Sequence, residues 1–77
     1  MPSASPPDWV VAHRRAIGEH IRASRREKRL SQERLAELAG IDRQAVNRIE
    51  QGHQAAYIDT LIRIARALDT PLADLVR

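Results

Sequence analysis

Two short helical patterns separated by a single glycine constrain the fold of this chain more than any other feature. In the stretch AELAGIDRQAVNRIEQG, residues 36–52, one pattern ends at Gly40 and a second begins at Asp42. Glycine adopts the left-handed conformation that terminates helices. The small side chains of Ala36 and Ala39 allow two helices to approach closely. Two short helices joined by a glycine-containing turn and crossing at a steep angle form a helix-turn-helix.

The rest of the chain is also typical of helices. Good helix formers dominate, aromatic residues make up 3%, and the alternation expected of strands is absent. We therefore predict an all-α, five-helix domain over residues 8–77, preceded by a disordered Pro-rich tail at residues 1–7. The expected helices cover residues 9–28, 32–39, 43–50, 58–68 and 72–76.

Gly18 stands inside the first expected helix, where glycine costs about 1 kcal/mol relative to alanine. No proline interrupts this stretch, so we still expect one long continuous helix. Asp8, Ser31 and Asp42 are the predicted N-caps. The predicted apolar faces comprise Leu35, Ala36, Leu38 and Ala39 in the second helix, and Ile58, Leu61, Ile62, Ala65 and Leu68 in the fourth.

The net charge of +3 comes from an Arg-rich set of 13 basic residues, in which Lys28 is the single lysine. Guanidinium groups pair with phosphates in bidentate geometry, so this composition favours a polyanionic partner. A charge of +3 is equally compatible with ordinary solubility. There is no cysteine, no signal-peptide pattern and no apolar run near the ~18 residues of a membrane span, so we expect a cytoplasmic protein without membrane association.

Catalytic and metal-binding patterns are weak. His13 and His20 are seven residues apart, but no third ligand completes a metal set. The chain has neither a Gly-rich phosphate loop nor a cysteine nucleophile. We therefore expect no enzyme activity, no metal site and no cofactor.

The second helix of the helix-turn-helix carries the side chains that read bases. Arg suits guanine O6 and N7, whereas Gln and Asn suit adenine N6 and N7. While Val46 and Ile49 anchor the helix inside, the outward positions hold Arg43, Gln44, Asn47 and Arg48. Taken alone, such residues are equally typical of a base-reading helix and of an ordinary solvated helix face.

The segment from Ile17 to Val76 resembles the lambda-repressor-like, Cro-type helix-turn-helix family, also called the xenobiotic-response-element family. The resemblance rests on IGEHIRASRREKRLSQERLAELAGIDRQAVNRIEQG followed by DTLIRIARALDTPLADLV. It implies a sequence-specific transcriptional regulator, of the repressor type, that binds double-stranded DNA as a homodimer. Residues 43–50 would then lie in the major groove.

The resemblance also assigns roles to single residues. Gln32 matches the family's phosphate-contacting Gln, and Arg25 with Glu50 matches a structural ion pair. Asp42 departs from the usual Ser or Thr, and we expect its carboxylate to cap its own helix. The loop HQAAY lacks the usual basic residue, which leaves His53 and Gln54 as its candidate phosphate contacts.

Trp9, Val10 and Val11 precede the segment that resembles the family. They either pack back on the domain, near the last helix, or form a dimer contact. Two alternative functions, in which the chain binds a partner protein, remain open. One is the antitoxin of a toxin–antitoxin pair that also autoregulates, and the other is a scaffold-type co-activator of the transcription machinery with weak DNA affinity.

Overall fold

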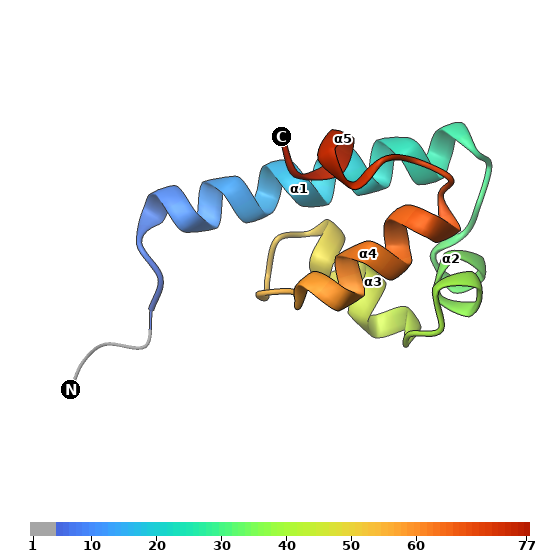
Figure 1. Ribbon diagram of the computed structural model, residues 1–77. Helices are drawn as coiled ribbons and strands as arrows, with labels where there is room; N and C mark the ends of the chain where they lie inside the picture. The colour runs from blue at the N-terminus through green and yellow to red at the C-terminus, as the bar shows by residue number, and fades with distance from the viewer. Residues whose placement is uncertain (1–4) are drawn as a thin grey trace.

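The computed structural model describes residues 5–77, and this part of the chain forms five helices and no strand. The helices are α1 (Asp8–Glu27), α2 (Gln32–Ala39), α3 (Arg43–Glu50), α4 (Ile58–Ala67) and α5 (Leu72–Val76) (Figure 1). The predicted all-α class is confirmed. The predicted tail lies largely outside the described residues, and only Ser5–Pro7 of it is described, as exposed chain before α1.

The ends of two helices differ from the prediction by one residue. α1 begins at Asp8, so Asp8 is not its N-cap; that position is held by Pro7, whose carbonyl accepts from the backbone N–H of Val10 (3.0 Å). α1 also ends at Glu27, and α4 ends at Ala67. Both chain reversals that follow use a left-handed non-glycine residue, Arg29 (φ 59°) after α1 and Asp69 (φ 53°) after α4.

α1 continues without a break through Gly18. The packing of α1 on α3 leaves no room for a side chain at this position. A Cβ at Gly18 would lie 2.5 Å from the carbonyl oxygen of Ile49 and against the carbonyl oxygen of Glu50. Contacts this short do not occur in native packing, so only glycine lets α1 lie directly on the end of α3. The local cost of a mid-helix glycine therefore serves the approach of two backbones.

The turn between α2 and α3 follows the predicted pattern at its two ends but not at Asp42. Ser31 Oγ accepts the N–H of Arg34 (2.9 Å) as the cap of α2, and Gly40 (φ 72°) adopts the left-handed conformation after it. Asp42 stands at the N-cap of α3, yet its carboxylate makes no capping bond. Its backbone carbonyl accepts from Ala45 instead (3.0 Å). The expected side-chain cap is therefore wrong.

One core joins all five helices, with buried side chains contributed by each of them: Ile21, Leu35, Ala36, Ala39, Val46, Ile49, Leu61, Ile64, Ala65, Leu68 and Leu75. Three residues assigned to apolar faces are in fact exposed, namely Leu38 (48%), Ile58 (57%) and Ile62 (50%). Ile64, which was not assigned to the face, is fully buried. The core face of α4 is thus rotated toward Leu61, Ile64, Ala65 and Leu68.

α1 runs along one side of the molecule, and its N-terminal half extends past the other helices (Figure 1). α5 folds back against α1, where His20 Nδ1 lies 3.0 Å from the carbonyl oxygen of Leu75 and His13 Nε2 lies 3.2 Å from that of Val76. The two histidines therefore hold the end of α5. No helix within residues 5–77 is long and apolar enough to cross a membrane, and these residues contain no cluster of three metal-ligating side chains.

Candidate nucleic-acid interface

α3 presents one polar side outward and anchors the other in the core. Val46 and Ile49 are buried, whereas Arg43, Gln44 and Arg48 are exposed to solvent. These three side chains are free to reach base edges in a groove that admits an α-helix. Arg43 and Gln44 occupy the first turn of α3, the end that meets the bases first in helix-turn-helix proteins.

Asn47 is half-buried and already bonded within the protein. Its Oδ1 accepts from Gln51 Nε2 (3.0 Å) and from Gln32 Nε2 (3.3 Å). An Asn that reads adenine in bidentate fashion must accept through this oxygen and donate through its nitrogen. As held here, Asn47 has only its two N–H donors left for a further partner.

Gln32, at the start of α2, links the two helices of the motif. Its Nε2 also donates to Glu50 Oε1 (3.1 Å), so both amide hydrogens are directed to α3. The backbone N–H groups of Gln32 and Glu33 precede the first intrahelical bond of α2 and remain available to an acceptor. A phosphate at this helix end would meet these N–H groups and the positive end of the helix dipole.

A buried ion pair fixes α1 against α3. Arg25 Nε lies 2.6 Å from Glu50 Oε2, and Arg25 Nη2 lies 3.0 Å from Glu50 Oε1, a bidentate arrangement. Arg25 and Glu50 are 9% and 4% exposed, and Arg25 Nη1 also donates to the carbonyl of Leu30 (2.8 Å). Since Glu50 in turn accepts from Gln32, one carboxylate orients α1, α2 and α3 together.

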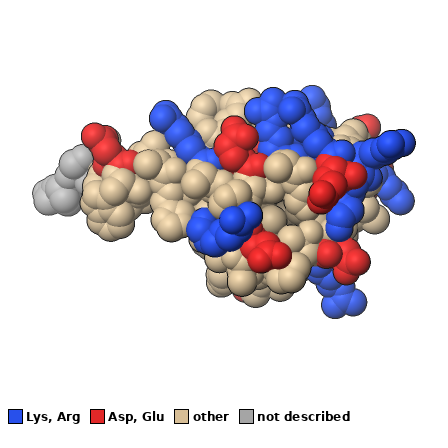
Figure 2. Space-filling model, turned by 90° about the horizontal axis from the view of Figure 1, so that it is seen from above, with Lys and Arg blue, Asp and Glu red and all other residues tan. Residues whose placement is uncertain are grey.

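Two basic residues beside this cluster were missed by the sequence analysis. Arg22 and Arg26 of α1 line a small hollow of about 170 Å³ together with Gln32, Asn47 and Gln51. Basic side chains gather over the end of the molecule where α1 ends, away from its N-terminal half (Figure 2). The helical spacing of Arg22, Arg25 and Arg26 indicates that they lie close together on α1. Only the packing of α1 on α3 places them next to the helix-turn-helix.

The loop between α3 and α4 contributes less charge than the helices. The backbone N–H of His53 donates to the carbonyl of Arg48 (2.9 Å), which closes the end of α3, and the His53 side chain is exposed. Gln54 is half-buried and lines a groove that faces α1. Of the two predicted phosphate contacts in this loop, His53 therefore has the more exposed side chain.

The segment Trp9–Val11 lies on the part of α1 that extends past the core. Trp9 is 75% exposed, while Val10 and Val11 are partly buried. Val10 lines the same groove as Gln54. The sequence predicted either packing on the domain or a dimer contact for this segment; in the structure Val10 lines the groove, whereas Trp9 is exposed.

Two short helices that pack on each other, a glycine turn between them and an exposed face of Arg43, Gln44 and Arg48 on the second helix define a DNA-binding helix-turn-helix protein. The helix-turn-helix family model HTH_3 matches residues 21–75, and the chain belongs to this family. It is a DNA-binding transcriptional regulator.

Two of the relatives are named as control or controller proteins. The control protein C.SmaI of Serratia marcescens is 35% identical over 60 residues, covering 78% of this chain and 71% of that protein. The crystal structure of the restriction-modification controller protein C.AhdI from Aeromonas hydrophila superposes with a TM-score of 0.81 at 36% identity, covering 83% of this chain and 97% of that one. An HTH_3 family transcriptional regulator from Vibrio cholerae has the same TM-score at 26% identity, with 86% of this chain and 37% of that chain covered.

Proposed function

We propose that this regulator recognises a specific DNA sequence by placing α3 in the major groove. The observation that carries the proposal is the exposed face of Arg43, Gln44 and Arg48 on a helix whose opposite side is buried. Arg43 and Arg48 suit guanine, and Gln44 suits adenine. Asn47 adds hydrogen-bond donors at the edge of this face.

Phosphate contacts would set the position of α3 on the duplex. The N-terminus of α2, with Gln32, supplies N–H donors on one side of α3. Arg22 and Arg26, which line the adjoining hollow, supply two charges. His53 and Gln54 are the candidate contacts on the other side. Such contacts hold the protein in register but carry no sequence information.

We further propose a homodimer that reads a two-fold-related operator and represses transcription by occluding the bound DNA. Two half-sites would lie about one helical turn, ~34 Å, apart. Two exposed apolar surfaces are available for the dimer contact. One is Trp9 on α1 (75% exposed), and the other is Tyr57, Ile58 and Ile62 at the start of α4 (84%, 57% and 50% exposed). The α4 surface escaped the sequence analysis because Ile58 and Ile62 were assigned to the core.

The similarity to C.SmaI and C.AhdI supports a narrower proposal for what is regulated. Both are named as controllers, and the match covers most of their lengths. We therefore propose that the genes controlled by this chain belong to a restriction–modification system. The antitoxin and co-activator alternatives require a protein surface rather than a DNA operator, and the exposed α4 surface would be their first contact site.

An in-vitro selection from a random DNA library tests the proposal, followed by the affinity of the enriched sites at increasing salt. A palindromic site with two half-sites, bound with an affinity that falls steeply with salt, is the expected result. A pool without enrichment, bound weakly at all sequences, would contradict sequence-specific regulation. A pull-down for a toxin or a component of the transcription machinery would then be the next experiment.

A further inference from the structure

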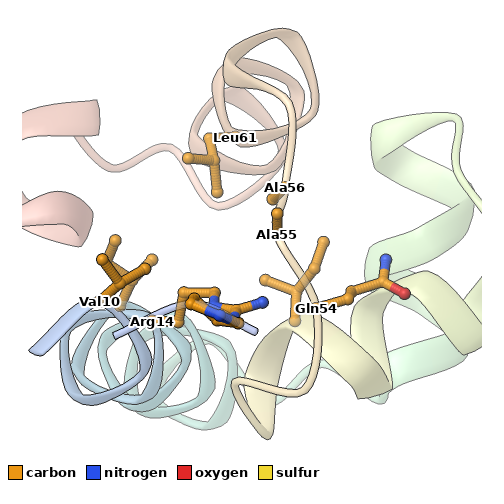
Figure 3. Close-up of a pocket in the computed structure, with 9 residues that line it drawn as sticks. Val10, Arg14, Gln54, Ala55, Ala56 and Leu61 are labelled. Carbon is orange, nitrogen blue, oxygen red and sulfur yellow. The ribbon is translucent and has the colours of Figure 1, made fainter. Parts of the chain in front are cut away.

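A groove separates the N-terminal half of α1 from the loop that precedes α4. Its volume is about 410 Å³, within the roughly 300–1,000 Å³ of small-molecule sites. Figure 3 shows Val10 and Arg14 projecting from α1, Leu61 across the groove on α4, and the loop passing beside them. The lining side chains used below are Val10, Arg14, Gln54, Ala55, Ala56 and Leu61.

This groove is not part of the DNA-reading surface. The groove is lined by the N-terminal half of α1 with Pro6 before it, by the loop, by Leu61 of α4 and by the core residue Ile49 of α3, whereas the base-reading side chains lie on the outer face of α3. The matched family model begins at residue 21, so Val10 and Arg14 lie outside it. The extension of α1 therefore builds one wall of the groove.

Arg14 brings an unpaired charge to this apolar site. Its Nε is buried and has no hydrogen-bond partner within residues 5–77. None of the side chains that line the groove is Asp or Glu. A buried guanidinium N–H without an acceptor requires an explanation, since buried polar groups are normally bonded. A carboxylate is the acceptor that matches the guanidinium fork best.

We propose that the groove binds an amphipathic monocarboxylate, a ligand with one carboxylate head and a compact apolar body. The carboxylate accepts from Arg14, and the apolar body packs against Val10, Ala56 and Leu61. The charge of the head complements Arg14, the one charged side chain among the residues that line the groove, and the body matches the apolar walls. DNA recognition does not require a ligand of this class, so its binding would be a separate means of regulating the protein.

Binding would act on the DNA-contacting elements through the loop. Gln54 and Ala55 follow His53 directly, and the groove also touches Ile49 of α3. A ligand wedged between α1 and the loop changes the position of the loop relative to α3. This regulatory consequence rests on the proposed function, whereas binding itself does not.

NMR titration of the 77-residue chain without DNA measures binding directly. The probes are octanoate and phenylacetate, with octanol as the uncharged counterpart of octanoate. We expect saturable shifts of the Ile17, Ala55 and Ala56 resonances with the carboxylates, and binding at least roughly tenfold weaker with octanol, because a charge-assisted hydrogen bond is lost.

Two variants and one control make the test specific. Arg14→Gln removes the charge and should bring octanoate down to the affinity of octanol. Ala55→Leu fills the groove from an exposed position and should weaken both probes. Arg66→Gln removes a charge of the same sign from an exposed position of α4, outside the groove, and should leave octanoate binding unchanged.

Three results would overturn the proposal. The first is the absence of saturable shifts at these residues, and the second is equal binding of octanol and octanoate. The third is a shift of the same resonances with protein concentration alone, which would make a second copy of the chain the occupant. If the carboxylates bind but do not change DNA affinity, only the regulatory consequence fails. If no operator is found, the NMR result still stands.

Discussion

The backbone of Gly18 lies directly against the carbonyl oxygen of Glu50, the last residue of α3. The side chain of the same Glu50 binds Arg25, two turns further along α1. One residue of α3 is thus held by α1 through its main chain and through its carboxylate. This double contact sets the angle at which α1 supports the DNA-reading helix.

Replacing Gly18 by alanine should destabilise the domain even though alanine favours helices by about 1 kcal/mol. The added Cβ would meet main-chain atoms of Ile49 and Glu50, which cannot yield as a side chain can. Overpacking of this kind costs up to about 3 kcal/mol. We expect a net loss of about 2 kcal/mol in urea unfolding. Ala16→Gly, at an exposed position of α1, calibrates the propensity effect, and a stabilised Gly18→Ala would contradict the close packing.

Removing the carboxylate of Glu50 should lower stability much more than removing that of Glu37. Glu50→Ala leaves Arg25 charged, buried and unpaired, a loss of about 3–5 kcal/mol. Glu37 forms an exposed pair with Arg34, for which we expect less than about 0.5 kcal/mol. Thermal unfolding of both variants measures the contrast. Similar melting temperatures for the two would show that the buried pair is not structural.

Arg43→Ala should weaken binding to the selected operator by about 1–3 kcal/mol and relax the preference at one base pair. Arg43 is exposed in the first turn of α3, so its removal leaves the core intact. Competition binding with operators altered at single positions measures both effects. Arg66→Ala, which removes an exposed Arg from α4, is the control. Unchanged affinity and preference for Arg43→Ala would refute the assignment of α3 as the reading helix.

Arg26→Ala should weaken binding to all DNA sequences alike. Arg26 lines the hollow beside Gln32, where we propose a phosphate contact. Losing one phosphate contact reduces the slope of log affinity against log salt by about 1. Gln32→Ala should also weaken binding to all sequences, since it removes the hydrogen bond that ties the N-terminus of α2 to Glu50, but it should leave this slope unchanged because Gln32 is neutral. A loss of affinity that depends on the base sequence would instead place the Arg26 side chain in the major groove of the DNA.

The two exposed apolar surfaces give opposite expectations for dimer formation. If the α4 surface forms the dimer, Ile62→Lys shifts sedimentation to the monomer with little change in stability, since this side chain is half-exposed. If α1 forms it, Trp9→Ala does so instead. We expect the α4 variant to have the larger effect, because three neighbouring apolar side chains are exposed there. A dimer that survives both substitutions would rule out both surfaces.

The order of the helices and the all-α class followed from local signals, since caps, glycines and apolar spacing act within a few residues. Gly40 shows this well, because a left-handed turn after a short apolar pattern needs no tertiary information. The exposed face of α3 was predictable for the same reason, with Val46 and Ile49 fixing the opposite side.

Packing between distant segments decided what the sequence alone left open or misplaced. Gly18 looked like a weakness of the first helix and proved to be the contact with α3. Ile58 and Ile62 had the spacing of a core face, but α4 is rotated so that Ile64 is buried in their place. Arg14 and the loop residues Gln54 to Ala56 line one groove only because α1 extends past the core. Periodicity tells which residues share a face, whereas only the docking of the helices determines what that face meets.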